Sequence, residues 1–205
     1  NSTPFIDTNI EGNQVFIHAD QQKGNKKTLI LDQLPRTILS TANAENPTMV
    51  VAKQEMESWQ LLQLEPAMLR SPDNISYTET RKIQINGSHL PATLYRLSYH
   101  NDIDIKSQIA NRLSELIDDV FTIDVDKDEK RDLLTLIVKS KKGTPMSARF
   151  LSDGTLRFLA LSVIEADPET QGIICLEEPE NGIHPTRIPA MLQLIRDIAC
   201  DTDLP

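Results

Sequence analysis

The 205-residue sequence is poor in several residue types, and each shortage argues against a class of protein. Its only two cysteines, Cys175 and Cys200, have no metal-ligand spacing and do not suggest a disulfide framework. No apolar run approaches the roughly 20 residues that a membrane-spanning helix needs. Aromatic residues make up only 4% of the chain, which predicts a mainly aliphatic core. We therefore expect a globular protein of a reducing compartment, in the cytoplasm and without membrane contact.

Positive charge is also scarce. The chain has 21 Lys and Arg against 30 Asp and Glu, a formal net charge of -9. A protein that holds nucleic acid by itself needs clustered basic side chains to neutralise phosphates. The two densest basic stretches, residues 23–27 and 139–142, are more typical of solvated loops or strand ends. We therefore expect any contact with DNA or a partner protein to lie outside this chain, or to arise only when two copies associate.

Hydrophobic periodicity predicts short strands and helices without internal repeats. In the first part of the chain we expect a hairpin of residues 14–19 and 28–31, and two short strands at residues 61–64 and 82–85. Three helices are expected: one from Asn46-Pro47 onward, one at residues 91–99 and one at residues 104–118. Three further strands are expected at residues 121–126, 133–139 and 146–150. The helix that follows residue 152 is apolar nearly all round, which predicts a central position. A short strand and an amphipathic helix beyond Pro185 come last.

The clearest chemistry lies where an apolar run stops on two carboxylates. Residues 173–176, bounded by Gly172 and Pro179, predict a short buried strand. Glu177 and Glu178 follow it directly, at the strand's carboxyl end, which is where open α/β sheets bind ligands. Two acids there can hold a magnesium ion and orient a water beside a phosphate. Taken alone, a Glu-Glu pair before a turn is more often an exposed acidic loop.

A second motif, Leu151-Ser-Asp-Gly-Thr155, opens the central helix. Ser152 is a favourable N-cap, and Gly154 lets a ligand approach a helix N-terminus, where free N–H groups and the dipole favour phosphate. Arg157, one turn further, carries charge toward a phosphate or pairs with a local acid. By itself this motif is more often a plain helix cap.

In this order, the two motifs resemble the second half of an ABC-type ATPase head. Residues 151–155 look like the signature motif, residues 173–177 like Walker B and residues 179–185 like the D-loop. The sequences Leu-Ser-Asp-Gly-Thr-Leu-Arg and Glu-Glu-Pro-Glu-Asn-Gly-Ile-His-Pro are similar to motifs of a family of bacterial ATPases related to the SMC, RecF and OLD-type heads. Residues 59–70 and 90–92 also resemble the middle region of that family.

The resemblance implies roles for individual residues. Glu177 would stand behind Mg²⁺, through a water, and Glu178 would be the catalytic glutamate that orients or deprotonates the attacking water. His184 stands where many D-loops have Asp, and would either hydrogen-bond across a dimer or cap a helix. The signature residues would contact the nucleotide held by a second protomer: Ser152, Asp153, Gly154, Thr155 and Arg157.

The implied fold is α/β: part of a P-loop NTPase with a central, mostly parallel sheet flanked by helices, plus an α+β middle lobe. Residues 1–118 would form the middle lobe and residues 119–205 the C-terminal part of the ATPase core. No Gly-x-x-x-x-Gly-Lys-Ser/Thr motif occurs among the seven glycines, and no switch histidine is present. Because the chain opens on Asn1 without Met, we expect it to be internal to a longer protein that supplies both, and to be inactive alone.

The implied function is ATP binding and Mg²⁺-dependent hydrolysis by a head that closes as a homodimer around two nucleotides, in DNA maintenance or defence. Two alternatives stay open. One is a catalytically inert assembly or binding module that keeps only the architecture. The other is a metal-dependent nuclease centred on Glu177, Glu178 and Glu180, for which the sequence ties no second acidic cluster to this one.

Overall fold

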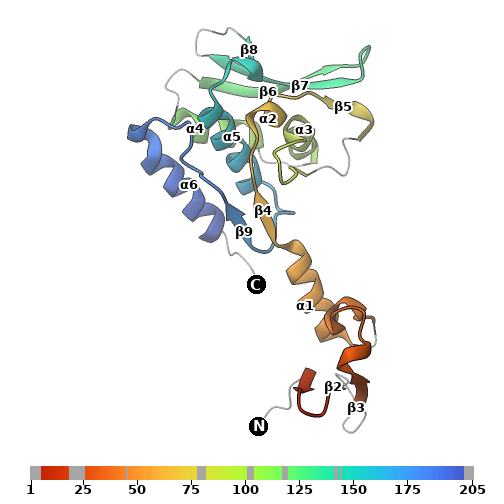
Figure 1. Cartoon of the computed structure of the whole chain (residues 1–205). Helices are drawn as coiled ribbons and strands as arrows, with labels where there is room; N and C mark the ends of the chain where they lie inside the picture. The colour runs from red at the N-terminus through yellow and green to blue at the C-terminus, as the bar shows by residue number, and fades with distance from the viewer. Residues whose placement is uncertain are drawn as a thin grey trace. The chain divides into compact units, whose positions relative to one another are not determined.

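The fold is taken from a computed structural model that describes residues 6–18, 26–44, 46–77, 82–100, 104–116, 120–140, 143 and 145–200. The chain divides into two compact units, Asn1–Trp59 and Gln60–Pro205 (Figure 1). This boundary lies well before the division at residue 118 that the sequence led us to expect.

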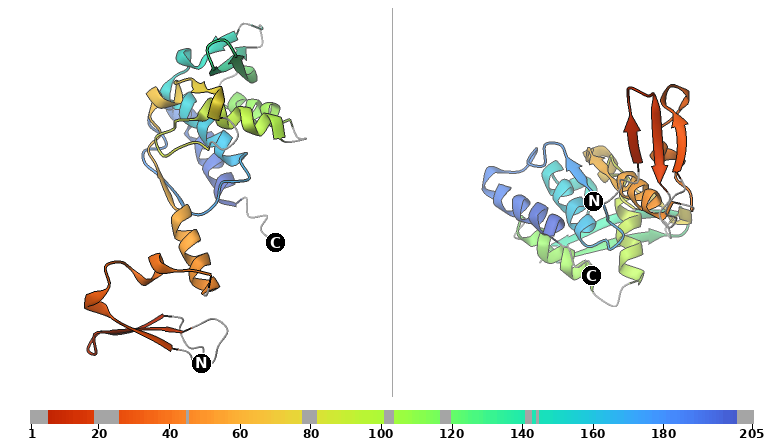
Figure 2. Two further views of the ribbon diagram at one scale, coloured as in Figure 1. Left: turned by 90° about the vertical axis from the view of Figure 1, so that its right-hand side faces the viewer. Right: turned by 90° about the horizontal axis from the view of Figure 1, so that it is seen from below.

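The first unit is a three-stranded antiparallel sheet followed by short helices (Figure 2). Its strands are β1 (Ile6–Asn9), β2 (Gln14–His18) and β3 (Lys26–Ile30), and its helices are η1 (Leu31–Gln33), η2 (Ile38–Thr41) and α1 (Pro47–Ser58). The register of β2 on β3 pairs Gln14 with Ile30, which confirms the predicted hairpin; the residues that join the two strands lie outside the described ones. Its small core comprises Val15, Ile17, Ile38 and Met49.

The second unit is built around α5 (Asp153–Glu165), in which every side chain from Phe158 to Ile164 is buried. The helix is thus central, as its all-round apolar pattern predicted. Burying each large aliphatic or aromatic side chain contributes about 1.5–3 kcal/mol, so this helix supplies much of the unit's stability. Among the described residues, the other α-helices of the unit are α2 (Pro66–Leu69), α3 (Leu90–His100), α4 (Ile105–Ser114) and α6 (Ile188–Cys200), and a short helix η3 (Ile75–Tyr77) follows β5. Among the residues described, no helix is both long and apolar enough to cross a bilayer.

The larger sheet of this unit is antiparallel. Its strands are β5 (Asp73–Asn74), β6 (Val120–Asp128), β7 (Leu133–Ser140) and β8 (Pro145–Ser147), in the order β5-β7-β6 with β8 also pairing β7. The strand that we predicted at residues 146–150 is too long, because the chain turns into η4 (Ala148–Phe150) after Ser147. The Ser147 side chain accepts a hydrogen bond from the Arg149 N–H and so caps that turn.

Two short strands form the one parallel pair in the described part of the chain. β4 (Gln60–Leu62) lies beside β9 (Ile174–Leu176), with Leu61 opposite Cys175. The expected mostly parallel sheet is therefore represented only by this pair. Because β4 and β9 lie in one unit, residues 60–118 belong with residues 119–205 rather than with the first 59 residues.

The β4–β9 pair is buried on one face only. Leu62 is almost completely buried against the core, whereas Leu61 and Ile173 are 45% and 47% exposed and Cys175 is also exposed. The prediction of a strand buried on both faces is thus wrong for β9 in this structure.

The predicted strand at residues 82–85 is also absent, although its end lies beside the chain that leaves β4. The carbonyls of Ile85 and Asn86 accept hydrogen bonds from the N–H groups of Gln63 and Glu65.

Candidate functional site

Three segments meet at the carboxyl end of the β4–β9 pair. They are the residues that follow β4, the turn that follows β9, and the first turn of α5. The sequence separates the first of them from the other two by roughly a hundred residues. The parallel pairing of β4 with β9 brings the first two together, and Arg157 bonds α5 to both. This is the edge at which open α/β sheets bind their ligands.

Gln63 and Glu177 form the contact between the two strand ends. The N–H of Glu177 donates to Leu62 O at 3.4 Å, and the Gln63 side-chain amide donates to Glu177 Oε2 at 2.9 Å. Sequence reasoning missed Gln63, because the predicted strand at residues 61–64 placed it inside a strand rather than just beyond one. The signal that could have found it is positional: in a parallel pair, the residues that follow both strands emerge at the same edge.

Glu178 occupies a tight turn. Its backbone is left-handed, with φ of 45°, a conformation that costs a non-glycine residue about 1 kcal/mol or more. Asn181 holds the turn twice: its N–H donates to Glu178 O at 3.0 Å, and its side-chain amide donates to Glu178 Oε2 at 3.0 Å. The second of the two candidate acids therefore has a fixed backbone and a hydrogen-bonded carboxylate.

The first turn of α5 is capped as the sequence predicted. Ser152 Oγ accepts the Thr155 N–H at 3.2 Å and lies 2.8 Å from Thr155 Oγ1. Asp153 pairs with Arg70, whose Nη2 lies 2.6 Å from Asp153 Oδ1 and 2.9 Å from Leu151 O. Arg70, at the C-terminal end of α2, thus fixes the entry to α5 from outside the motif.

Gly154 faces the turn that follows β9. A Cβ at this position would lie 2.3 Å from the carbonyl oxygen of Gly182, a separation that no side chain can occupy. Gly182 itself has a φ of 79°, which glycine adopts without strain. In this structure the absence of a side chain at Gly154 thus allows the backbone of the turn after β9 to approach; the ligand contact expected there stays a prediction.

Arg157 joins the helix to both neighbouring segments. Its Nε donates to Leu64 O at 3.2 Å and its Nη1 donates to Asn181 O at 2.6 Å. The sequence left two roles open for this side chain, a phosphate contact or an ion pair with a local acid. In the described structure its hydrogen bonds are to backbone carbonyls.

His184 lies just before η5 (Pro185–Arg187) and acts as its N-cap. Its Nδ1 lies 2.8 Å from Thr186 Oγ1 and 3.4 Å from the Thr186 backbone nitrogen. The ring is exposed, as are Glu177, Glu178 and Glu180. Among the described residues, no group of three or more His, Cys, Asp or Glu side chains is arranged to hold a metal ion.

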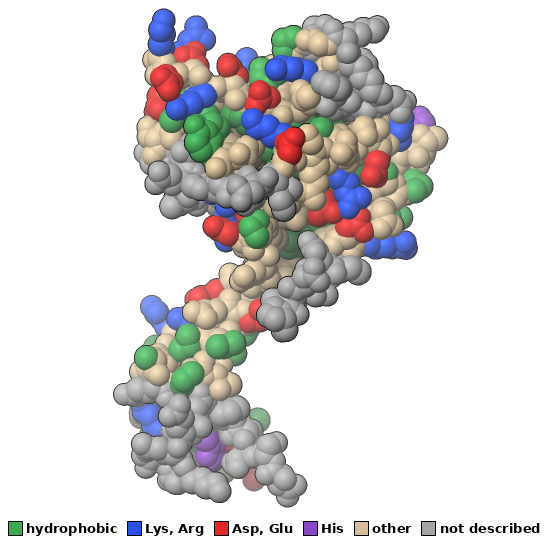
Figure 3. All heavy atoms as spheres, turned by 180° about the vertical axis from the view of Figure 1, so that it is seen from behind, with side chains coloured by type: hydrophobic (Ala, Val, Ile, Leu, Met, Phe, Trp, Pro, Cys, Tyr) green, Lys and Arg blue, Asp and Glu red, His purple; other side chains and the backbone are tan. Residues whose placement is uncertain are grey.

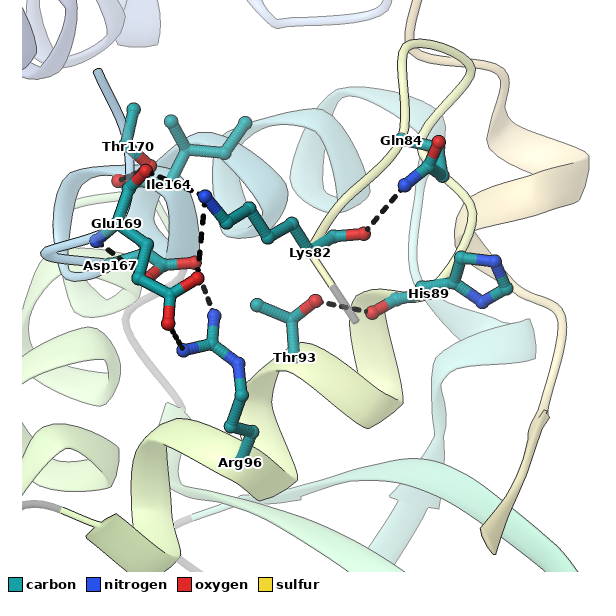
Figure 4. Close-up of polar contacts among 9 residues, drawn as sticks. All are labelled: Lys82, Gln84, His89, Thr93, Arg96, Ile164, Asp167, Glu169 and Thr170. Carbon is teal, nitrogen blue, oxygen red and sulfur yellow. Dashed lines mark hydrogen bonds and ion pairs between the residues drawn. The ribbon is translucent and has the colours of Figure 1, made fainter. Parts of the chain in front are cut away.

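A second polar cluster lies at the opposite, amino end of the same two strands (Figure 4). Arg96 and Asp167 form a buried ion pair of 2.5 Å, and Glu169 approaches Arg96 at 3.5 Å. Lys82 Nζ donates to the backbone carbonyl of Glu169 at 2.9 Å and lies 3.3 Å from the Glu169 carboxylate. These contacts join the segment that follows α5 to α3.

Acidic and basic side chains alternate over the Gln60–Pro205 unit on the face that Figure 3 shows. The described residues of that face therefore do not form the cluster of Lys and Arg side chains typical of a surface that binds nucleic-acid phosphates.

The site and the fold define an α/β protein whose polar residues gather at the carboxyl ends of parallel strands. Residues 47–201 match the family described as "AAA domain, putative AbiEii toxin, Type IV TA system". The match covers well over half of the chain, so the chain belongs to this AAA-domain family. AAA domains are P-loop NTPases, a class that binds ATP with Mg²⁺. No curated protein matches the sequence.

Proposed function

We propose that this chain is part of an ABC-type ATPase head that binds and hydrolyses ATP and closes as a homodimer around two nucleotides. The observation that carries the proposal is the meeting of three elements at one sheet edge: the capped N-terminus of α5, Gln63 after β4, and the two acids after β9. A helix N-terminus favours phosphate, and oxygen ligands beside it suit Mg²⁺. A role in DNA maintenance or defence belongs to the same proposal.

In this proposal each residue has a stated task. The side-chain carbonyl of Gln63 would hold Mg²⁺ and the carboxylate of Glu177 would stand behind the ion through a water, because both offer the hard oxygen donors that this ion prefers. Glu178 would accept a proton from the attacking water or orient it. Ser152, Asp153, Gly154 and Thr155 would face the nucleotide held by the partner protomer, and His184 would lie at the contact between the two heads.

The 205 residues contain no phosphate-loop motif, so the proposal requires that other residues of the protein supply it. The same residues would add strands to the β4–β9 pair and complete a larger parallel sheet. Residues 1–205 alone should then show no Mg²⁺-dependent ATP hydrolysis.

The test is Glu178→Gln in the intact protein, with ATP turnover and ATP binding measured separately. Loss of a general base lowers turnover by about 10²–10⁴-fold, whereas the neutral isostere should leave ATP affinity close to that of the wild type. Glu180→Gln is the matched control, because Glu180 is exposed and its carboxylate has no assigned task. Turnover at the wild-type rate in Glu178→Gln would refute the catalytic assignment.

The inert module is the second candidate, and it applies if no other residues of the protein supply a phosphate loop. It predicts an intact protein that has no Mg²⁺-dependent turnover at any ATP concentration. Wild-type turnover that disappears in Glu178→Gln excludes the inert module.

A further inference from the structure

Arg157 holds together the two chain segments that carry the candidate acids. It lies one turn into α5, and its half-buried guanidinium bonds Leu64 O, which lies 93 residues away in the sequence, and Asn181 O, 24 residues away. Nothing in the sequence relates those two carbonyls to each other. The side chain therefore forms a bridge between the strand ends that runs through the signature helix.

Each of the two carbonyls belongs to a segment that contacts one candidate acid. Leu64 follows Gln63, whose side chain donates to Glu177 Oε2 at 2.9 Å. Asn181, whose carbonyl accepts from Arg157, donates its side-chain amide to Glu178 Oε2 at 3.0 Å. The guanidinium thus bonds the residue that follows Gln63, which holds Glu177, and it bonds Asn181 itself, which holds Glu178.

An arginine suits this position for a physical reason. Its planar fork presents several N–H donors in fixed directions, so one side chain can hold two carbonyls at a set spacing. Bonds from a charged donor are also stronger than bonds between neutral groups. A lysine ammonium is a compact, mobile point charge, and it would hold the two segments less rigidly.

A backbone contact connects the turn to the same helix independently. Gly154 and Gly182 approach so closely that a Cβ on Gly154 would collide with the Gly182 carbonyl. The turn after Glu178 is therefore seated directly on the first turn of α5, one turn before Arg157. A displacement of the α5 N-terminus must displace this turn as well.

We propose that Arg157 is a positioning residue that couples the N-terminal turn of α5 to Glu177 and Glu178. This inference rests on the proposed function, and it changes the role that the sequence suggested for Arg157. Contact of a nucleotide with Ser152–Thr155 shifts α5, and Arg157 transmits the shift to Gln63 and Asn181 and through them to both acids. The coupling makes hydrolysis depend on engagement of the signature helix, while binding of ATP does not require it.

The kinetic test compares Arg157→Gln and Arg157→Lys with the wild type in the intact protein. Misplaced acids should lower kcat by about 10–100-fold in Arg157→Gln, with ATP affinity within about threefold of the wild type. Arg157→Lys should have an intermediate kcat, because it keeps the charge but not the fork. Arg131→Gln is the control: Arg131 is 79% exposed, in the β6–β7 turn, and the substitution should change neither value.

The structural test needs no nucleotide and uses hydrogen exchange in the same proteins. In Arg157→Gln the amides of Gln63, Glu65, Asn181 and Ile183, which donate to backbone carbonyls, should exchange faster together. The amides of the β6–β7 hairpin should keep their wild-type rates, which also shows that the variant is folded.

The outcomes separate the two proposals. A wild type without ATPase activity defeats the proposed function, and hydrogen exchange then decides the coupling alone. Unchanged exchange in both segments overturns the coupling, whatever the activity. A wild-type kcat in Arg157→Gln overturns it as well, as does an equal loss of kcat and ATP affinity, because Arg157 would then be a nucleotide ligand.

Discussion

The contact between Gly154 and Gly182 requires a glycine at position 154. An alanine at position 154 would place its Cβ 2.3 Å from the Gly182 carbonyl oxygen, and backbone atoms cannot move aside as a flexible side chain can. Gly154→Ala should therefore lower the free energy of unfolding by about 1–3 kcal/mol, the cost of an overpacked site. It should also abolish ATP turnover, because the turn that carries Glu178 would move off α5. Denaturant unfolding and an ATPase assay measure the two effects.

Gly143→Ala separates steric collision from backbone strain. Gly143, unlike Gly154, has a positive φ of 78°, and a Cβ there would meet nothing within 4 Å. Gly143→Ala should lower the free energy of unfolding by about 1 kcal/mol through backbone strain and leave ATP turnover unchanged. If Gly154→Ala retained wild-type turnover, the seating of the turn on α5 would not matter for the site.

At the same scale, the sequence predicted the candidate acids and the Ser152 cap from local patterns. Gln63, Arg70 and the carbonyl partners of Arg157 could not be found in this way, since their partners lie far away in the chain. Only the pairing of β4 with β9 reveals which residues emerge together.

At the scale of elements, the Arg96–Asp167 ion pair fastens α3 to the end of α5. Both side chains are buried, with exposures of 8% and 3%. Asp167→Asn would remove the buried carboxylate nearest to Arg96 and leave the partly exposed Glu169 carboxylate at 3.5 Å, which should cost about 3 kcal/mol. Chemical denaturation monitored by circular dichroism gives the value.

The matched control is Glu169→Gln, which removes a carboxylate that also contacts Arg96. Because that carboxylate is 54% exposed, its loss should cost less than about 1 kcal/mol. Equal losses in the two variants would show that burial does not control the strength of this cluster.

Long periodic helices were the elements that the sequence predicted best. α3 spans Leu90–His100 where residues 91–99 were expected, and α6 begins just beyond Pro185. Short apolar runs were predicted poorly: residues 82–85 form no strand, and the strand before α5 stops at Ser147. Four or five apolar residues do not specify a strand, because the partner and the neighbouring turn decide whether the ladder forms.

At the scale of the whole molecule, the α/β class and the ATPase family followed from two motifs near the C-terminus. The division into two units could not be predicted from these motifs, because it depends on the pairing of β4 with β9, which are separated by more than half of the chain. Composition and periodicity carry no information about such long-range pairing.

The last prediction concerns the exposed face of the β4–β9 pair, which carries Leu61, Ile173 and Cys175. Parallel sheets are normally covered on both faces, and the proposed ATPase head would cover this one with elements outside residues 1–205. In a Cys200→Ser variant of the intact protein, Cys175 should then react with a thiol reagent about tenfold or more slowly in the native state than in urea, since access limits cysteine reactivity. Similar rates in the two states would mean that the face stays open and that the sheet is not extended there.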